Sequence, residues 1–432
     1  SSFAQNLNKI GIETPTVLDP SYFKTAFNTL QKFIKKGYIQ AGHDVGSGGL
    51  ITSLLEMCFP SSSVGMTLNF ANFKEQDLVK ILFSEKSAVL LQSRENLSSH
   101  FKKRGIAVCK IGEITNSGIL KINEFDLDVA QMRTTWMATS KALETYQTTL
   151  NLAKKRTENI VNQPLKFKFP AGFKGCLPLP KKVKIKAAVL REKGSNSERE
   201  MAYAMDLSGF EVRDIHMTDL IEGRETLEDI QFLVAVGGFS NSDVLGSAKG
   251  WAGTIKYNKC ANTALSSFFT RPDTLSLGVC NGCQLFVELG LLNPKDDLKP
   301  KMLHNESGKF ECIFTAVTIE QSNSIMLKGL EGSTLGIWAA HGEGRFFLPK
   351  EESHYQIPAK YLYPEYPSNP NGSDFNAAML SSNDGRHLVM MPHLERSTFS
   401  WNWGHYPSNR TDEVSPWILA FENAFNWLKT SN

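Results

Sequence analysis

The stretch TLSLGVCNGCQLFVELG, residues 274–290, decides the fold of the second half of the chain. It begins as a short apolar run that predicts a buried strand, and it ends with apolar residues at helical spacing. Between these two segments, Cys280 lies between Gly278 and Gly282. Small neighbours permit a strained strand-to-helix turn that exposes the sulfur above a sheet. A helix amino terminus stabilises a thiolate, and its free N–H groups bind an oxyanion, so we predict that Cys280 is a nucleophile.

Three other interpretations of this motif stay open. Cys280 and Cys283 form a C-x-x-C pair such as zinc sites use, although no second ligand pair follows at suitable spacing. The same pair at a strand-to-helix turn is typical of thioredoxin-like redox proteins, but the chain has no second thioredoxin feature. The third interpretation is two thiols packed in a core, since cysteine is among the most buried residue types.

Strand and helix patterns alternate on the amino-terminal side of this turn. The segments VKIKAAVL (183–190), FEVRDIHM (210–217) and QFLVAVGGF (231–239) predict strands, and SNSEREMAYAMDLSG (195–209) predicts a helix. Repeated strand and helix units call for a parallel sheet with right-handed crossovers. Such sheets place their sites at the carboxyl ends of the strands, where we expect Cys280 to lie.

A candidate base for the nucleophile follows far downstream. In HLVMMPHLERS, residues 387–397, an apolar strand is closed by Pro392 and followed by His393 and Glu395. Side chains two residues apart in extended backbone point to the same side, so the carboxylate can hold the tautomer of the imidazole. A cysteine nucleophile needs such a base and such an orienting group. An exposed ion pair is the alternative interpretation.

Gly237 and Gly238 follow the apolar strand in VAVGGFSNSDVLG, residues 234–246. Glycines at this place let the backbone approach a bound ligand and turn an N–H group toward it. A tight turn without a ligand explains them equally well.

The first part of the chain predicts a layered α/β domain, and the chain divides into residues 1–150, a linker at 151–183 and a second domain at 184–432. A helix begins at Asp19 and Pro20 and ends at Gly37. Four apolar residues at helical spacing are expected to face a core: Phe23, Phe27, Leu30 and Ile34. Residues 50–59 predict a second helix, and residues 88–92 and 107–114 predict strands. The segment 151–183 is rich in proline and lysine, which favours a solvated connector.

Composition excludes several classes of protein. With 432 residues and 41% hydrophobic side chains, the chain is long enough for two or three packed domains. The 47 basic and 44 acidic residues leave a formal charge of +3, so we expect no nucleic-acid partner. No apolar stretch is long enough to span a bilayer, and the chain shows no export signal, so we expect no membrane association. The seven cysteines are an odd number, which favours reduced thiols in the cytoplasm.

With these elements in order, the sequence resembles the class I, triad-type glutamine amidotransferases, whose G-x-C-x-G-x-Q signature is met from Gly278 to Gln284. Five segments together look like the carboxy-terminal amidotransferase domain of the large, single-chain phosphoribosylformylglycinamidine synthases. They are LREKGSNSEREMA (190–202), GGFSNSDVLGSAKGWA (237–252), GVCNGCQ (278–284), HGEGRF (341–346) and DGRHLVMMPHLER (384–396). The resemblance implies a flavodoxin-like amidotransferase domain over residues 184–432.

The amino-terminal part carries a second resemblance. GHDVGSGGLITSLLEMCF (42–59), IGEI (111–114) and MRTTWMATSKALE (132–144) resemble the last domain of the synthetase portion of that family, which is similar to the carboxy-terminal domain of aminoimidazole ribonucleotide synthetase. We therefore expect an amino-terminal synthetase region, absent from this chain, as the partner. The resemblance implies ATP and Mg²⁺ for the full-length enzyme and no cofactor in the amidotransferase domain. Which residues of 1–150 hold a metal is left unknown.

The resemblance also implies a reaction and roles for seven residues. Glutamine is hydrolysed to glutamate and ammonia, and the ammonia converts formylglycinamide ribonucleotide to the amidine at an ATP-dependent centre. Carried over by motif, Cys280 attacks the carboxamide, His393 moves the proton and Glu395 orients His393. Backbone N–H groups near Gly237, Gly238 and Asn281 are expected to hold the oxyanion, and Gln284 to shape the glutamine pocket.

The sequence departs from the family pattern at two turns and at SWNWGHYP (400–407), where we expect His405 to have a packing or surface role. Asn241 and Ser242 stand where the family has Tyr-Gly, so a position with positive φ is expected to be affected, and Ser47 replaces a common acidic residue. In HGEGR, we expect His341 and Glu343 to be structural, with Arg345 as the partner of Glu343. The alternatives for the whole chain are a fragment that acts as a binding module until it joins the synthetase region, and a C-x-x-C redox protein.

Overall fold

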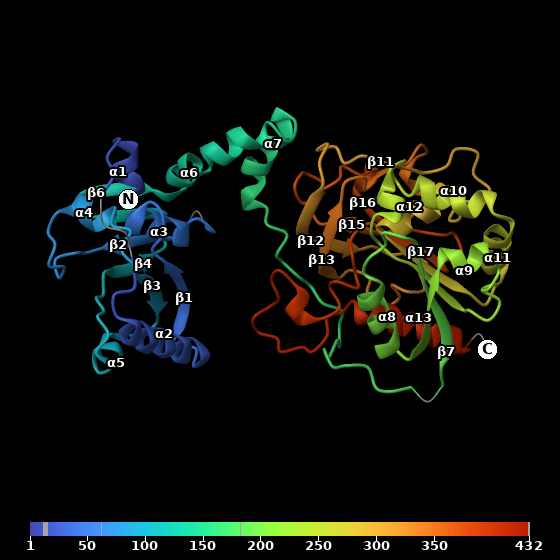
Figure 1. Cartoon of the computed structure of the whole chain (residues 1–432), viewed down its shortest axis with the longest axis horizontal. Helices are drawn as coiled ribbons and strands as arrows, with labels where there is room; N and C mark the ends of the chain where they lie inside the picture. Colours follow the sequence, from blue (N-terminus) through green and yellow to red (C-terminus); the bar gives the residue numbers. More distant parts are fainter. Residues whose placement is uncertain (12–15, 62, 182, 431–432) are drawn as a thin grey trace. The chain divides into compact units, whose positions relative to one another are not determined.

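The computed structural model describes residues 1–11, 16–61, 63–181 and 183–430, which form two compact units (Figure 1). The units are Ser1–Ala142 and Leu143–Asn432. The domain boundaries predicted at residues 150 and 184 remain predictions. In the structure, the predicted connector 151–183 belongs to the second unit, because Phe167 and Phe169 pack their rings against Trp403.

The first unit combines helices with two small sheets. Its helices are α1 (Ser2–Asn6), α2 (Pro20–Lys35), α3 (Gly49–Cys58), α4 (Leu78–Leu82), α5 (Ser98–Lys102) and α6 (Val129–Glu144), which ends in the second unit. Its strands are β1 (Ile39–Asp44), β2 (Gly65–Leu68), β3 (Val89–Ser93), β4 (Gly112–Thr115), β5 (Ile119–Ile122) and β6 (Phe125–Asp128). β1 pairs with β3, and the other strands form a sheet in the order β4-β2-β5-β6. The expected layered α/β architecture is confirmed.

Two local predictions for this unit need correction. The strand expected at 107–114 is confined to β4, because residues 107–111 pair with no strand in the described structure. Helix α2 begins at the predicted cap, where Asp19 Oδ1 accepts the Tyr22 N–H at 2.9 Å. The prediction that Phe23 and Phe27 face a core is wrong, because both side chains are half-exposed. The helix packs instead through Phe33, which belongs to a buried hydrophobic cluster.

The second unit is built on one nine-stranded sheet. Its strands are β7 (Ile185–Arg191), β8 (Phe210–His216), β9 (Phe232–Ala235), β10 (Leu275–Val279), β12 (Glu311–Ile319), β13 (Thr334–His341), β15 (Gln356–Tyr361), β16 (Ala377–Ser381) and β17 (His387–Met390). A separate pair joins β11 (Lys301–Leu303) to β14 (Arg345–Phe347). The helices are α7 (Leu150–Glu158), α8 (Glu198–Leu207), α9 (Met217–Ile221), α10 (Lys249–Tyr257), α11 (Lys259–Thr270), α12 (Asn281–Glu288) and α13 (Ile418–Thr430). Short 3₁₀ turns occur at Asn159–Val161, Ser240–Asp243, Glu352–His354, Asp374–Asn376 and Ser400–Asn402.

The sheet order is β13-β12-β15-β16-β17-β10-β9-β7-β8, and its two halves differ. From β8 to β17 the strands are parallel and follow the flavodoxin-like order, as predicted. From β17 to β13 every pairing is antiparallel, which the sequence analysis did not predict. The reason is that the described chain has no α-helix between α12 and α13 to serve as a crossover. Helices α8 and α13 pack together on the sheet, and α10 and α11 pack beside α12 (Figure 1).

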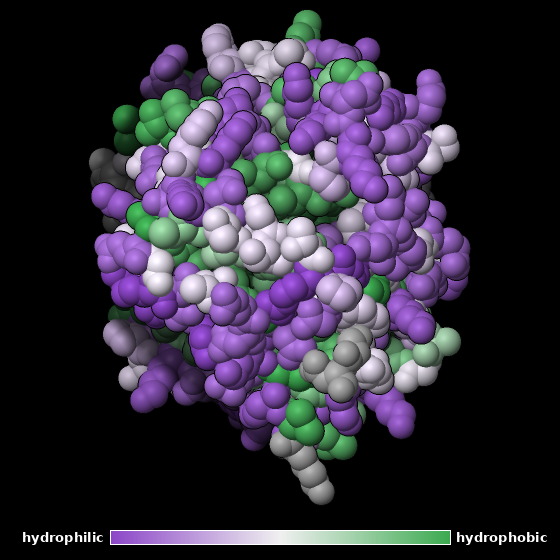
Figure 2. Space-filling view, turned by 90° about the vertical axis from the view of Figure 1, so that its right-hand side faces the viewer, coloured by the Kyte–Doolittle hydropathy of each residue, from purple (hydrophilic) through white to green (hydrophobic). Residues whose placement is uncertain are grey.

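The surface is largely polar on the side where α9, α10 and α11 lie in Figure 1. Figure 2 shows that hydrophilic side chains dominate this face, with smaller hydrophobic groups between them. Among the residues that the structure describes, no helix combines the length and the apolar character that a membrane span requires.

The main chain of helix α12 approaches the main chain of the sheet very closely at two glycines. A Cβ atom added at Gly282 would be 2.0 Å from the Ala235 carbonyl oxygen of β9, and one added at Gly278 would be 2.7 Å from the Gly282 oxygen. Both glycines are therefore required by close approach, as predicted for the neighbours of Cys280.

We expect Gly282→Ala to lower the free energy of unfolding by about 1–3 kcal/mol, because the new methyl group meets main-chain atoms that cannot move aside. Thermal or chemical unfolding measures the change. The matched control is Gly253→Ala in α10, where an added Cβ meets nothing within 4 Å. Alanine there improves helix propensity by up to about 1 kcal/mol, so a Gly282→Ala protein as stable as the control would contradict the packing argument.

Candidate active site

Cys280 occupies a strained turn between β10 and α12. Its φ of 52° and ψ of −109° place a non-glycine residue at positive φ, a conformation that persists only where surrounding structure enforces it. The Cys280 N–H donates to the Met390 carbonyl of β17 at 2.8 Å, and its thiol donates to the Ala340 carbonyl at 3.6 Å. The predicted turn is thus confirmed, and the sulfur faces β13 at the carboxyl end of β10.

His393 and Glu395 form a buried pair directly beside this turn. The His393 N–H donates to the Trp338 carbonyl at 2.7 Å, which holds the segment after β17 against β13. His393 Nδ1 and Glu395 Oε1 are 2.6 Å apart, and both residues are 2% exposed. The alternative of an exposed surface pair is therefore wrong.

The sheet register brings the histidine to the cysteine. Val279 of β10 is the Cα partner of Met390 of β17, so the two strands end side by side. A Cβ atom added at Gly237 would be 2.9 Å from His393 Cε1 and 3.3 Å from Cys280 Cβ, so Gly237 touches both residues. Only a glycine leaves room for the cysteine and the histidine to meet.

The environment favours a charged imidazole. Burial alone would lower the pKa of His393, but the Glu395 carboxylate and then Cys280 raise it to about 10. Burial likewise opposes the charged form of Glu395, whose pKa nevertheless stays below its ordinary value because His393 is its partner. Neither His393 Nε2 nor Glu395 Oε2 has a hydrogen-bond partner among the described residues. Nε2 is therefore free to exchange a proton with the thiol or with a substrate.

Two backbone N–H groups without an acceptor among the described residues lie at the Cys280 turn and at the glycine pair that adjoins it. Gly238, with φ of 127°, is held by hydrogen bonds on both sides, from Asn196 N–H to the Gly237 carbonyl and from Phe239 N–H to the Gly194 carbonyl, both at 2.9 Å. The Gly238 N–H itself has no acceptor in the part of the chain that the structure describes. Asn281 opens α12, so its N–H has no helical acceptor either. This arrangement can hold an oxyanion beside Cys280.

Side chains around the helix start form one connected wall. Asn281 accepts the Ser240 N–H at 3.1 Å and donates to Gln284 Oε1 at 2.8 Å, and Gln284 Nε2 donates to the Glu343 carbonyl at 2.7 Å. All seven residues that the sequence analysis assigned to the site thus lie around one turn. In the altered turn after Phe239, φ is positive, at 52° for Asn241 and 58° for Ser242.

The structure adds Glu343 to this neighbourhood, and the prediction that Arg345 is its partner is wrong. Arg345 lies 3.8 Å from Asp374, whereas the Glu343 carboxylate bonds to the Ser247 hydroxyl and lies 3.6 Å from His304 Nδ1. Burial and the Glu343 charge together raise the pKa of Asp243. The signal that could have revealed Glu343 is its place two residues after a buried strand end, opposite the cysteine motif.

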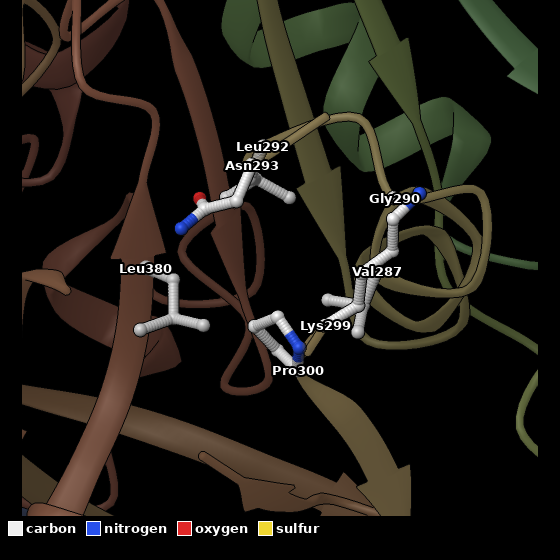
Figure 3. A pocket seen from close by; sticks show the side chains of 7 residues that line it. All are labelled: Val287, Gly290, Leu292, Asn293, Lys299, Pro300 and Leu380. Carbon is white, nitrogen blue, oxygen red and sulfur yellow. The ribbon is translucent and has the colours of Figure 1, made fainter. Parts of the chain in front are cut away.

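Three other features were considered as sites: the Cys283 thiol, clusters of metal-ligating side chains, and a hollow beside α12. Cys283 is fully buried, and burial raises its pKa well above the ordinary value. The described residues hold no group of three or more His, Cys, Asp or Glu side chains arranged for a metal. The hollow in Figure 3 involves none of the seven site residues; it is lined by Val287, Gly290, Leu292, Asn293, Lys299, Pro300 and Leu380.

Comparisons with known proteins match both units. A CobB/CobQ-like glutamine amidotransferase domain matches residues 184–428, and the AIR synthase related protein, C-terminal domain, matches residues 4–123. The chain is 40% identical over its whole length to a probable phosphoribosylformylglycinamidine synthase, chloroplastic/mitochondrial, of Arabidopsis thaliana, and it covers 33% of that protein. It is 34% identical over 99% of its length to the human phosphoribosylformylglycinamidine synthase, of which it covers 35%. The chain thus spans about a third of the length of these relatives.

Among solved structures, the chain is similar to PurLQS from Thermotoga maritima. The match has 26% sequence identity and a TM-score of 0.46, and it covers 57% of this chain and 100% of that chain.

We expect Glu395→Gln to destabilise the protein most at low pH. A His393 pKa raised from about 6.5 to about 10 contributes stability that is fully present below pH 6.5 and is lost as the pH rises through 10. Without the carboxylate this contribution disappears, so the loss of melting temperature should be largest at pH 6 and shrink toward pH 10. Glu352→Gln, which breaks the exposed pair with Lys360, is the control. An equal loss at every pH would show that Glu395 does not hold the charge on His393.

Proposed function

The chain belongs to the family of CobB/CobQ-like glutamine amidotransferase domains, and on that basis we propose that it hydrolyses glutamine and supplies ammonia for phosphoribosylformylglycinamidine synthesis. One observation carries the proposal. A strained cysteine at the start of a buried helix lies beside a buried His–Glu pair and beside unpaired N–H groups. This is the set of groups that acyl transfer from an amide requires: a nucleophile, an oriented base and an oxyanion site.

In the proposed reaction, His393 Nε2 carries the proton that the Cys280 thiol has given up, as the charged imidazole described above, and the sulfur attacks the side-chain carboxamide of glutamine. The tetrahedral intermediate collapses to a glutamyl thioester when the carbon–nitrogen bond breaks and His393 returns the proton to the departing ammonia. Water, deprotonated by His393, then hydrolyses the thioester to glutamate and restores the thiol. Glu395 stays bonded to His393 Nδ1, so that Nε2 is the nitrogen that gains and loses the proton.

The N–H groups of Gly238 and Asn281 are proposed to bind the oxyanion of each tetrahedral intermediate. Removal of one such donor from a comparable site costs about 3 kcal/mol of transition-state stabilisation. Gly237 contributes by its size, because it lets the Cys280 and His393 side chains meet. Gln284, fixed to the Glu343 carbonyl, is proposed to line the pocket for the glutamine α-carbon substituents.

The second half of the proposal concerns the whole enzyme. We propose formylglycinamide ribonucleotide and ATP as further substrates and an amino-terminal synthetase region as the partner; the product in the name of the Arabidopsis relative, of which this chain covers 33%, supports this proposal. The described residues show no cluster of ligating side chains that fits Mg²⁺, so we derive no step through a metal from this chain. A cytoplasmic location also stays a proposal, since the name of that relative refers to chloroplasts and mitochondria.

We expect a glutamine-like diazoketone to alkylate Cys280 alone, because the reagent needs both the nucleophile and the glutamine pocket. Peptide mass mapping measures the adduct, which Cys280→Ala and excess glutamine should each abolish. Cys283→Ala is the control and should leave labelling of Cys280 unchanged, since Cys283 is buried in the core.

The outcomes also separate the alternatives. Labelling of Cys280 without release of ammonia from glutamine would favour a fragment that is idle until it joins the synthetase region, and adding that region should then restore turnover. No adduct, or equal labelling of Cys283 and Cys260, would overturn the proposed nucleophile. A reversible disulfide between Cys280 and Cys283 would support the redox interpretation instead.

A further inference from the structure

One buried amide holds the turn between β13 and β14. Asn305, 2% exposed, lies in the loop between β11 and β12. Its backbone N–H donates to the Gly342 carbonyl at 2.9 Å, and its Nδ2 donates to the His341 carbonyl at 2.7 Å. Its Oδ1 accepts the Gly344 N–H at 2.9 Å. A single residue thus binds backbone groups of three residues on the turn 341–344: His341, Gly342 and Gly344.

The same amide determines the tautomer of His341. Nδ2 faces two carbonyl oxygens, those of His341 and Lys309, so the orientation of the amide is unambiguous and Oδ1 faces the His341 ring. His341 Nδ1 lies 3.3 Å from that oxygen and therefore carries the hydrogen. Burial and then the charge of His393 lower the pKa of His341 to about 3, so the ring is neutral. Its Nε2 is a lone pair with no partner among the described residues.

This turn is one wall of the proposed glutamine site. The residue before it, Ala340, accepts the Cys280 thiol at 3.6 Å. Within it, the Glu343 carbonyl accepts Gln284 Nε2 at 2.7 Å. A shift of the turn would therefore move the Gln284 side chain that lines the proposed pocket.

Charged groups anchor the loop at its other end. The Asn305 amide reaches the Lys309 carbonyl, and Lys309 Nζ lies 2.5 Å from Glu144, the last residue of α6. Both side chains are about four-fifths buried, so this pair is screened less than a surface pair. Arg156 of α7 joins it, 3.1 Å from Glu144 and 3.2 Å from Glu311 at the start of β12. The loop is thus tied to Glu144 and Arg156, which belong to the same unit as the site.

We propose that Asn305 is a positioning residue of the glutamine site, and that the Lys309–Glu144 pair holds the loop in the position from which Asn305 acts. This inference rests on the proposed glutaminase function. Asn305 touches no reacting atom; it acts through the turn 341–344.

The test compares two reagents at Cys280. A glutamine-like diazoketone reports the cysteine together with the pocket, whereas iodoacetamide reports the reactivity of the cysteine alone. For Asn305→Ala we expect diazoketone labelling to slow by about 30-fold, because a displaced turn misplaces the bound substrate. Iodoacetamide labelling should change by less than about threefold, because the Cys280 turn and its N–H donors do not involve Asn305.

A second pair of variants tests the anchor without removing the amide. Lys309→Met should slow diazoketone labelling by about three- to tenfold, because one partly buried ion pair couples the loop to its anchor. Lys309→Arg keeps the charge and should restore the labelling rate. Lys350→Met, which breaks a similarly buried pair with Asp296 elsewhere, should leave both rates unchanged. The melting temperature of every variant is measured alongside, so that a loss of fold is recognised. If Asn305→Ala does not fold, the two Lys309 variants decide the test.

Three outcomes would overturn the inference. If the wild-type chain reacts with the diazoketone and Asn305→Ala and Lys309→Met react at the same rate, then Asn305 and the Lys309–Glu144 pair do not position the turn. Equal slowing of both reagents would show a general structural role. A wild-type chain that does not react with the diazoketone would refute the proposed function itself, and this inference would fall with it.

Discussion

The close approach of α12 to the sheet is the constraint on which the rest of the site depends. Cys280 adopts positive φ because the chain must turn from β10 into a helix whose first turn lies on the Ala235 carbonyl. That geometry needs glycine at 278 and 282, and it leaves the N–H groups at the start of α12 without acceptors. Strain, exposure of the sulfur toward β13 and oxyanion donors are therefore consequences of one packing arrangement.

A buried charge pair is the second physical requirement. His393 and Glu395 are both almost fully buried, and removal of one member of such a pair typically costs about 3–5 kcal/mol. The pair gains little for stability over an apolar pair of similar size, since taking both charges out of water is unfavourable. Its value lies in chemistry: the carboxylate raises the pKa of the imidazole and leaves Nε2 as the group that exchanges protons.

The sequence predicted the parallel half of the site well, because local patterns determine it. A strand, a Gly-x-Cys-x-Gly turn and a helix are contiguous, and their buried strands read as apolar runs. His393 and Glu395 were recognisable from their spacing after an apolar strand, although their burial was not. The antiparallel half was not predicted, since its pairings join residues as far apart in the chain as Val317 and Tyr361, with no crossover helix to signal them. Asn305 and the true partners of Glu343 depend on those non-local pairings and left no local pattern.

The division of the sheet has a mechanistic meaning. Its parallel half supplies the proposed nucleophile, the proposed oxyanion donors and the His–Glu pair, all from strand ends that adjoin one another by register. Its antiparallel half supplies the wall formed by the turn 341–344, which backbone register alone does not place against Gln284. A buried asparagine side chain makes that placement, because an amide offers two donors and an acceptor at fixed angles and so can join three backbone groups at once. An apolar residue of similar size would fill the space and leave those three groups unsatisfied, which is why a polar contact rather than packing fixes this side of the site.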